Sequence, residues 1–593
     1  MTTTLNKPAA LRPAQPGGIS RYLPFLNWLV HYRRDDLVGD LLAGLIVAIM
    51  LVPQGMAYAM LAGLPPEVGL YASILPLIIY GLLGTSRSLA VGPVAIVSLL
   101  VASGITPLAE PGSVPYVQLA LTLALLVAVI QLVMGVVKLG FLVNFLSHPV
   151  LAGFTSAAAI VIGFSQMKHL LGVSIGRTEV FYEQVLLVGE SLPQTNPLTL
   201  AIGLGSIAVL FYFKQGLGKH LRGGGISESL LVPVTKAGPL VVVLGSTLLV
   251  FFLGLSERFG VKVVGDVPAG LPPLTAPTFD LGVWSALLPT ALAISFVGFM
   301  ESISVAKSLA SKKRQKVQAN QELIALGAAN FGATFTGGFP VTGGFSRSVV
   351  NFAAGANTGL ASIITALLIG LTVMFLTPLF YFLPNAVLAA IIMVAVAGLI
   401  DVKTFRHVWK YNKADALSMI VTFVAVLAVG VESGILVGVA AAILLFVWRT
   451  SRPHMAVVGR IGQSETYRNV LRHSVATCPH VVAIRVDQSL YFANTKYLED
   501  TILTIVADRP EVKHLVLIGI AINFIDASAL ETLESLVYEL RGAGVEFYMA
   551  DIKGPVMDRL KAIGFVAHLG EDHFFLSTHD AMLALNCTGN SQA

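Results

Sequence analysis

Two short stretches decide how this chain folds: SLAVGPVAIVSLL at residues 88–100 and GGFPVTGGFSRSVVNFAAG at residues 337–355. Each lies among apolar runs, contains helix breakers and is too short to cross a bilayer, which takes about 20 residues of helix. Backbone that is not helical survives at membrane depth only where protein or a wet cavity satisfies its polar groups. The two stretches therefore predict a pair of broken helices, with ordinary interfacial loops as the alternative.

The composition around these stretches predicts an integral membrane protein. Of the 593 residues, 55% are hydrophobic and 12% are charged, and the mean hydropathy is +0.79. A soluble globule needs far more polar surface than this. The net charge of +5 comes without a basic stripe carrying interleaved aromatics, so nucleic acid is not expected as a partner.

The cysteine count is low, because only Cys478 and Cys587 are present. We take this count to exclude a disulfide framework and a cysteine-rich metal site, and to favour a reducing, cytosolic face for this part of the chain.

Apolar runs and their breakers predict fourteen spans in two sets of seven. The first set is expected near residues 40–62, 67–84, 93–104, 116–138, 148–170, 198–214 and 238–256. The second set is expected near residues 284–306, 321–334, 346–354, 358–381, 386–400, 414–430 and 432–448. The broken helices come third in each set, as an inverted repeat would place them.

The lysines and arginines predict the orientation. With a cytosolic N-terminus, every even-numbered connection is inside, and these connections hold most of the positive charge, including KKRQK at 312–316 and KTFRHVWKYNK at 403–413. The outside connections are nearly bare. Both termini are therefore expected in the cytoplasm.

The broken helices predict an anion site at mid-membrane. Pro93 suits the first position of one helix, and Gly343 and Gly344 allow close approach of the backbone before the other. We expect Ser346 to cap this second helix. Two facing helix N-termini attract a small anion, because their N–H groups are free and their dipoles are positive there.

Arg347 is expected in the first turn of the second broken helix, where its charge opposes the dipole and is costly to bury. A bound anion would offset both costs. The alternatives are that Arg347 snorkels to an interface or pairs permanently with a carboxylate.

Glu301 lies inside the apolar eighth span, where its charge is expensive. It could therefore take and release a proton during transport. The alternative is a static ion pair with Arg347 or Lys307. Ser302 and Ser304 flank it and could supply oxygens to sodium, so both coupling ions stay open.

In the first span, Pro53 and Gly55 are expected to interrupt the helix next to Gln54. Tyr58 lies four residues further on and shares a face with Gln54. Either side chain could line the anion site, and a kinked helix packing against its neighbours explains the same residues equally well.

From about His480 the pattern changes to alternating strands and helices, which predicts a small α/β domain. No phosphate loop, metal-ligand cluster or nucleophile with a base is evident, so an enzyme is not expected. In NFIDASALETLESL, Asp526 or Ser528 could cap a helix, or Ser528 could be phosphorylated or contact a partner.

These residues resemble a known family. VPQGMAYAMLAGLPPEVGLYASILPLIIYGLLGTSRSLAVGPVAIVSLL, residues 52–100, resembles the signature region of the SulP sulfate permeases and anion transporters. NQELIALGAANFGATFTGGFPVTGGFSRSVVN, residues 320–351, is similar to their ninth and tenth spans. The C-terminal part resembles a STAS domain, in which Ser528 aligns with the phosphorylatable serine of the soluble antagonists.

The resemblance implies an α-helical polytopic membrane protein of 7+7 inverted repeats, divided into core and gate domains, with a cytosolic α/β STAS domain. It implies a homodimer, elevator-like motion and no cofactor. By motif, the substrate-binding residues would be Gln54, Tyr58, Val94, Gly344, Phe345, Ser346 and Arg347. Glu301 would be the coupling carboxylate and Ser528 a regulatory site.

The resulting hypothesis is a secondary anion transporter that imports sulfate with protons across the bacterial inner membrane. The predicted domains are a cytosolic tail at 1–35, a transport domain at 36–450 and the STAS domain at 451–593. The alternatives are a sodium- or proton-coupled carrier of bicarbonate or a dicarboxylate, and an anion channel or voltage-responsive motor. Glu301 argues against the motor, which has no obvious use for an ionisable residue there.

Overall fold

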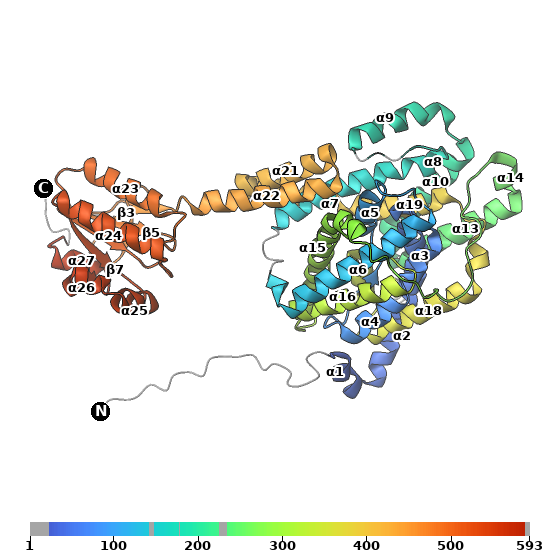
Figure 1. The fold of residues 1–593 in the computed structure, drawn as a ribbon, viewed down its shortest axis with the longest axis horizontal. Coiled ribbons are helices and arrows are strands. Elements are labelled where there is room, and N and C mark those ends of the chain that lie inside the picture. Colours follow the sequence, from blue (N-terminus) through green and yellow to red (C-terminus); the bar gives the residue numbers. More distant parts are fainter. Residues whose placement is uncertain (1–22, 142–146, 177, 179, 224–233, 588–593) are drawn as a thin grey trace. The chain divides into compact units, whose positions relative to one another are not determined.

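The computed structural model describes residues 23–141, 147–176, 178, 180–223 and 234–587 (Figure 1). Most of the predicted N-terminal tail, residues 1–22, therefore lies outside the described residues. The chain divides into two compact units, Met1–Ala442 and Ile443–Ala593.

Each of the seven spans predicted in the first set coincides with a helix or a pair of helices. These are α2 (Arg34–Ala62), α3 (Pro66–Tyr71) with α4 (Leu75–Leu83), α5 (Ala95–Ile105), α6 (Val114–Val136), α7 (His148–Ser165) with α8 (Met167–Leu171), α10 (Pro197–Phe211) and α13 (Gly238–Leu253).

The second set is matched in the same way, by α15 (Leu281–Lys312), α16 (Ala319–Phe335), α17 (Phe345–Ala353), α18 (Leu360–Phe375), α19 (Asn385–Val396), α21 (Lys413–Val429) and α22 (Val431–Thr450). Shorter helices lie between or before the spans: α1 (Phe25–Val30), α9 (Phe181–Ser191), α11 (Leu217–Gly223), α14 (Leu255–Phe259) and α20 (Val402–Tyr411). Within the described part of the chain, eight helical segments are long and apolar enough to cross a membrane.

Two predictions about the first spans are wrong in detail. Pro53 does not interrupt the first span, because α2 runs unbroken through it. Gly55 serves close packing instead: a Cβ on Gly69 would overlap the Gly55 carbonyl oxygen, so α2 and α3 touch backbone to backbone. The second span is split before α4, where Pro76 has no N–H to bond the carbonyl of Ala72.

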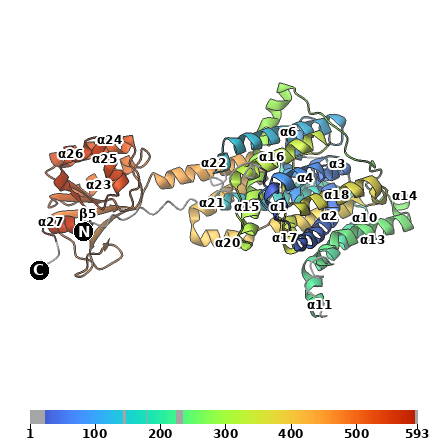
Figure 2. The ribbon, with the colours of Figure 1, turned by 90° about the horizontal axis from the view of Figure 1, so that it is seen from below.

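The helices of the first unit pack in two groups. In one group α6 lies along α15 and α16, and α2 lies along α18 and α17 (Figures 1 and 2). In the other group α7 lies along α21, and α10 lies along α13 and α19. This grouping takes the first four spans of each set into one bundle and the last three into another, as core and gate domains require.

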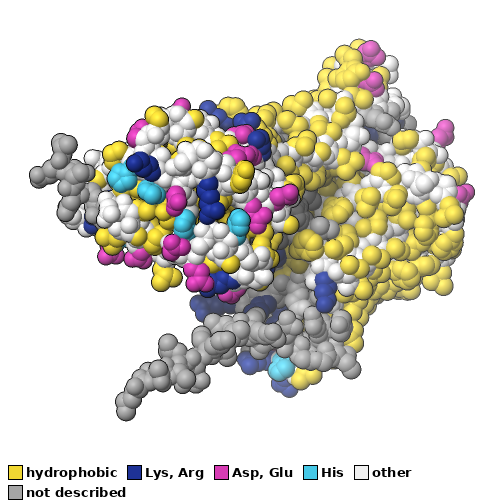
Figure 3. Space-filling model, turned by 60° about the vertical axis from the view of Figure 1, so that its left-hand side comes forward, with side chains coloured by type: hydrophobic (Ala, Val, Ile, Leu, Met, Phe, Trp, Pro, Cys, Tyr) yellow, Lys and Arg dark blue, Asp and Glu magenta, His cyan; other side chains and the backbone are white. Residues whose placement is uncertain are grey.

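The outer surface of the first unit is apolar, as a lipid-facing surface must be. Figure 3 shows large hydrophobic side chains over it. Residues on three different helices are examples, namely Val136 on α6, Phe252 on α13 and Phe375 on α18, each about two-thirds exposed or more.

The second unit is a six-stranded sheet in the order β4-β3-β5-β6-β7-β8. The strands are β3 (Met455–Arg460), β4 (Tyr467–Asn469), β5 (Val481–Val486), β6 (His514–Ile518), β7 (Glu546–Ala550) and β8 (Phe574–Phe575). β5 to β8 are parallel, and β3 is antiparallel to its neighbours. The helices are α23 (Thr495–Ala507), α24 (Ala527–Gly542), α25 (Gly554–Ala562), α26 (Phe565–Leu569) and α27 (Thr578–Ala584).

The predicted alternation of strands and helices in this domain is confirmed, because β5, β6 and β7 are each followed by a helix. The alternation had not revealed β3 and β4, which extend the sheet on its antiparallel side.

Candidate functional site

The two broken helices meet at their N-terminal ends, as predicted. β1 (Val91–Gly92) pairs antiparallel with β2 (Thr342–Gly343), so that Val91 lies opposite Gly343. α5 and α17 begin within three residues of these strands. The N-termini of both helices are therefore held at one place by a two-stranded ladder.

The predicted helix starts are wrong by one or two residues. α5 begins at Ala95 with Val94 as its N-cap, so Pro93 lies outside the helix and not at its first position. α17 begins at Phe345 with Gly344 as its N-cap, and no side chain caps it. Ser346 is therefore the second helical residue, not the cap, and its exposed side chain is left for other partners.

The non-helical backbone between the spans is satisfied by buried side chains, as membrane depth demands. The Ser302 hydroxyl accepts from the Gly343 N–H at 2.9 Å and lies 2.7 Å from the Thr342 hydroxyl. The Asn330 side chain accepts from the Val341 N–H at 2.8 Å and donates to the Val341 carbonyl.

These polar side chains were the ones that the sequence analysis missed or misread. In the sequence, Asn330 stands out as an amide inside an apolar span. The structure buries it fully. Ser302 had been considered as a sodium ligand, but its hydroxyl is used by the backbone of β2. Ser304 is exposed and lies two residues away.

Arg347 is buried between the two helix starts, with 3% of its surface exposed. Its Nη1 donates to the Pro93 carbonyl at 2.7 Å. Among the described residues, Nε and Nη2 have no hydrogen-bond partner. Arg347 thus does not snorkel, and its hydrogen bond within the described part of the chain goes to a carbonyl instead of a carboxylate.

Glycines make room for this guanidinium. A Cβ on Gly344 would lie 3.0 Å from Nη2 of Arg347, and a Cβ on Gly92 would lie 3.3 Å from it. Gly92 also has a φ of +145°, which L side chains rarely adopt. A side chain at either glycine would crowd the guanidinium, so these glycines allow Arg347 to lie between the two helix starts.

Glu301 on α15 lies at the start of α17. Its carboxylate accepts a hydrogen bond from the Phe345 N–H and interacts electrostatically with Arg347. Its Oε2 is buried and has no hydrogen-bond partner among the described residues. A carboxylate at a helix N-terminus compensates the dipole, so Glu301 already occupies part of the positive pocket.

Tyr58 and Gln54 are both buried on α2, with 6% and 7% of their surface exposed. Tyr58 interacts electrostatically with both Arg347 and Glu301. Gln54 shares its helix face, one turn earlier.

Val94 and Phe345 border the same place. A methyl of Val94 lies 3.2 Å from where a Cβ of Gly344 would stand. Phe345 is 55% exposed although Gly344 before it and Arg347 after it are buried. Phe345 and Ser346 therefore face open space at the start of α17.

In the second unit, Asp526 caps α24 by accepting from the Ala529 N–H at 2.8 Å. Ser528 is exposed in the first turn and its side chain is not the cap. The choice between the two residues as cap is thereby settled in favour of Asp526, and the Ser528 hydroxyl is accessible.

Comparisons with known proteins cover nearly the whole chain. Residues 37–422 match the sulfate permease family, and residues 473–581 match the STAS domain. The probable sulfate transporter 4.2 of Arabidopsis thaliana is 36% identical over 95% of this chain and 83% of its own. High affinity sulfate transporter 2 of Stylosanthes hamata is 33% identical over 95% of this chain and 86% of its own.

Solved structures agree with the fold. The murine Solute Carrier 26 family member A9 anion transporter, in the inward-facing state, superposes with a TM-score of 0.87 at 27% identity. That match covers 97% of this chain and 96% of the other. The transmembrane domain of the cyanobacterial bicarbonate transporter BicA covers 69% of this chain and 98% of its own, with a TM-score of 0.56 at 22% identity, which supports the fold alone.

Proposed function

We propose, from the premise that this chain belongs to the sulfate permease family and carries a C-terminal STAS domain, that it takes up sulfate together with protons. Membership of a transporter family also means that it is a multi-pass membrane protein and not an enzyme. The observation that carries the proposal is the buried Arg347, which lies between the starts of α5 and α17 with N–H groups on Nε and Nη2 that no described residue accepts.

Sulfate fits the chemistry of this place. An arginine fork binds a tetrahedral oxyanion through two parallel hydrogen bonds, and helix N-termini add N–H donors. We assign Gln54, Tyr58, Val94, Gly344, Phe345, Ser346 and Arg347 to the substrate site. The names of the relatives support sulfate as the anion, because the two relatives described above are both called sulfate transporters.

Proton coupling is proposed for Glu301. As a carboxylate, Glu301 uses the first N–H of α17 and cancels much of the charge of Arg347. Protonation would remove that negative charge and release the N–H to the incoming anion. Sulfate and a proton would then enter the site together, which is symport.

The proposal extends to location and assembly. We place the protein in the bacterial inner membrane as a homodimer with both termini in the cytoplasm, and keep the domains at 1–35, 36–450 and 451–593. The orientation rests on the lysines and arginines of the inside connections. Phosphorylation of the exposed Ser528 would add charge at the N-terminus of α24, where the dipole favours it.

The test is uptake of labelled sulfate into proteoliposomes, with and without an inward proton gradient. Bicarbonate and fumarate serve as competitors, and an inward sodium gradient at equal pH serves as the alternative driving force. The proposal requires gradient-driven sulfate uptake that excess unlabelled sulfate suppresses. Uptake driven by sodium alone would refute proton coupling, and a competitor that enters when sulfate does not would refute the substrate.

A further inference from the structure

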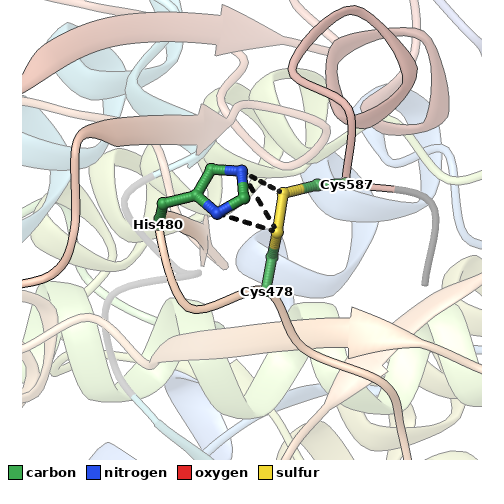
Figure 4. Close-up of a disulfide and its surroundings, with 3 residues drawn as sticks. All are labelled: Cys478, His480 and Cys587. Carbon is green, nitrogen blue, oxygen red and sulfur yellow. Dashed lines mark hydrogen bonds between the residues drawn. A yellow bond between two sulfur atoms is a disulfide. The ribbon is translucent and has the colours of Figure 1, made fainter. Parts of the chain in front are cut away.

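The C-terminal unit contains a sulfur and imidazole cluster that the transport site does not use. Cys478 precedes β5, Cys587 follows α27, and a disulfide joins them across 109 residues with their Cα atoms 5.8 Å apart. Figure 4 shows the ring of His480 beside both sulfur atoms. The presence of only two cysteines led us to expect neither a disulfide framework nor a cysteine-rich metal site, yet the structure joins the two in one disulfide.

The distances from the imidazole of His480 to the two sulfurs match those in zinc sites. Nε2 of His480 lies 3.4 Å from Sγ of Cys587 and 3.7 Å from Sγ of Cys478. In tetrahedral zinc sites, with metal–sulfur bonds of about 2.3 Å and metal–nitrogen bonds of about 2.0–2.1 Å, the sulfur–nitrogen separation is about 3.6 Å. Both observed separations are within about 0.2 Å of this value. The three ligand atoms all lie within 4.8 Å of one another.

The backbone around the cluster is fixed by the sheet. The His480 carbonyl accepts from the N–H groups of Lys513 and His514 at 2.9 and 3.0 Å. The Cys587 N–H donates to the Met582 carbonyl at 2.8 Å, and Cys587 is 5% exposed against the core under α27. The sheet therefore keeps the backbone of both cysteines near the imidazole when the disulfide is opened, and the two sulfurs must move to about 3.8 Å apart to bind one tetrahedral metal.

We propose that Cys478, His480 and Cys587 bind one zinc ion when the disulfide is reduced. A dithiol supplies two electrons and two protons, which convert the disulfide into two thiols while the dithiol becomes a disulfide itself. Zinc then displaces the two thiol protons into solvent and takes the imidazole nitrogen as its third ligand. The metal ties the segment after α27 to the start of β5, as the disulfide does in the oxidised chain.

The test compares oxidised and reduced full-length protein in detergent. One sample is reduced with a phosphine, which the disulfide oxidises to the phosphine oxide while water supplies the oxygen and the two thiol protons. Both samples are then equilibrated with zinc and desalted without oxygen. Zinc per chain is measured by mass spectrometry of the metal. We expect about one zinc per reduced chain and none per oxidised chain.

Variants identify the ligands. Cys478→Ser, Cys587→Ser and His480→Ala should each weaken zinc binding at least about tenfold in competition with a chromophoric chelator, since even outer-shell changes cost 10–100-fold. The matched control is His568→Ala, which removes an exposed imidazole from α26 of the same unit. It should bind zinc like the reduced wild type.

A second measurement needs no variant. Cobalt in place of zinc should give reduced wild type a sulfur-to-cobalt charge-transfer band and strong tetrahedral absorption, both absent from the oxidised protein. Equal zinc content in the oxidised and reduced samples would overturn the proposal. So would a cobalt spectrum without thiolate bands, or full zinc retention by Cys478→Ser.

Discussion

Replacing Arg347 tests the proposed anion site most directly. The guanidinium has one N–H donor on Nε and two on Nη2 that no described residue accepts, besides the Nη1 donor that binds Pro93. We expect two of these free donors to bind a sulfate. Arg347→Gln removes the charge and the fork, whereas Arg347→Lys keeps the charge but not the fork.

The magnitude follows from the hydrogen bonds lost. A hydrogen bond to a charged group contributes about 1.5–3 kcal/mol, so losing two of them costs roughly 3–6 kcal/mol and weakens sulfate binding at least about 100-fold. Arg347→Lys retains at least one such bond and should weaken binding about 10- to 150-fold. A larger loss of sulfate affinity in Arg347→Gln than in Arg347→Lys separates the contribution of the paired guanidinium hydrogen bonds from that of the positive charge.

The assay is equilibrium binding of labelled sulfate to purified protein, together with KM for uptake in proteoliposomes. Arg87→Gln is the matched control, because Arg87 is exposed between α4 and β1 and undergoes the same chemical change. Binding by Arg347→Gln within about threefold of wild type, in a variant that elutes and melts like wild type, would refute the reasoning.

Three further predictions concern coupling, scaffold and the C-terminal domain. Glu301→Gln should bind sulfate but no longer respond to an inward proton gradient, since its amide takes up no proton; gradient-driven uptake by this variant in proteoliposomes would exclude Glu301 as the coupling residue. Ser302→Ala should lower the melting temperature, because the Gly343 N–H at membrane depth loses its acceptor at a cost of about 1–3 kcal/mol; an unchanged thermal melt would show that the hydroxyl is dispensable. Burial raises the pKa of Asp487, but hydrogen bonds from Arg485 and His454 lower it more, so the net pKa is below its usual value. The carboxylate therefore adds stability above the pKa of the unfolded chain, about 3.9, which is lost as the pH falls below it. Asp487→Asn should lower the protection of the β5 amides, measured as exchange relative to the unfolded chain at the same pH, at pH 7. It should also reduce the difference in protection between pH 7 and pH 3; protection equal to wild type at both values would contradict this.

The sequence predicted the elements well and their ends less well. Long apolar runs fix where helices lie. Glycine and proline within such a run are a weaker guide to where a helix breaks, since α2 continues through Pro53 and Gly55. The starts of α5 and α17 were misplaced because a strand pair of two residues each, between segments about 250 residues apart, sets them. Pairing over that distance leaves no local signal around Pro93 or Ser346.

The chemistry of the site divides in the same way. Arg347 could be singled out from the sequence, because a charged residue among glycines in an apolar chain is costly to bury, and the structure buries it between the two helix starts. Its hydrogen bond to the Pro93 carbonyl and the bond from Phe345 to Glu301 were not predictable. Each of these bonds joins two spans through a backbone group. Because nearly every residue has the same backbone groups, the sequence does not indicate which of them will bond.

Those two contacts bear on which anion the site suits. Two helix N-termini contribute about half an elementary charge each, so with Arg347 the site carries about +2 when Glu301 is protonated and about +1 when it is ionised. Sulfate carries two negative charges and is matched only by the protonated form. A monovalent anion is matched by the ionised form and has no electrostatic need for the proton. Proton coupling and a divalent substrate therefore form one hypothesis. Protonation of Glu301 at the start of α17 gives the site the charge that a divalent anion needs, and a divalent anion is the substrate that needs this protonation.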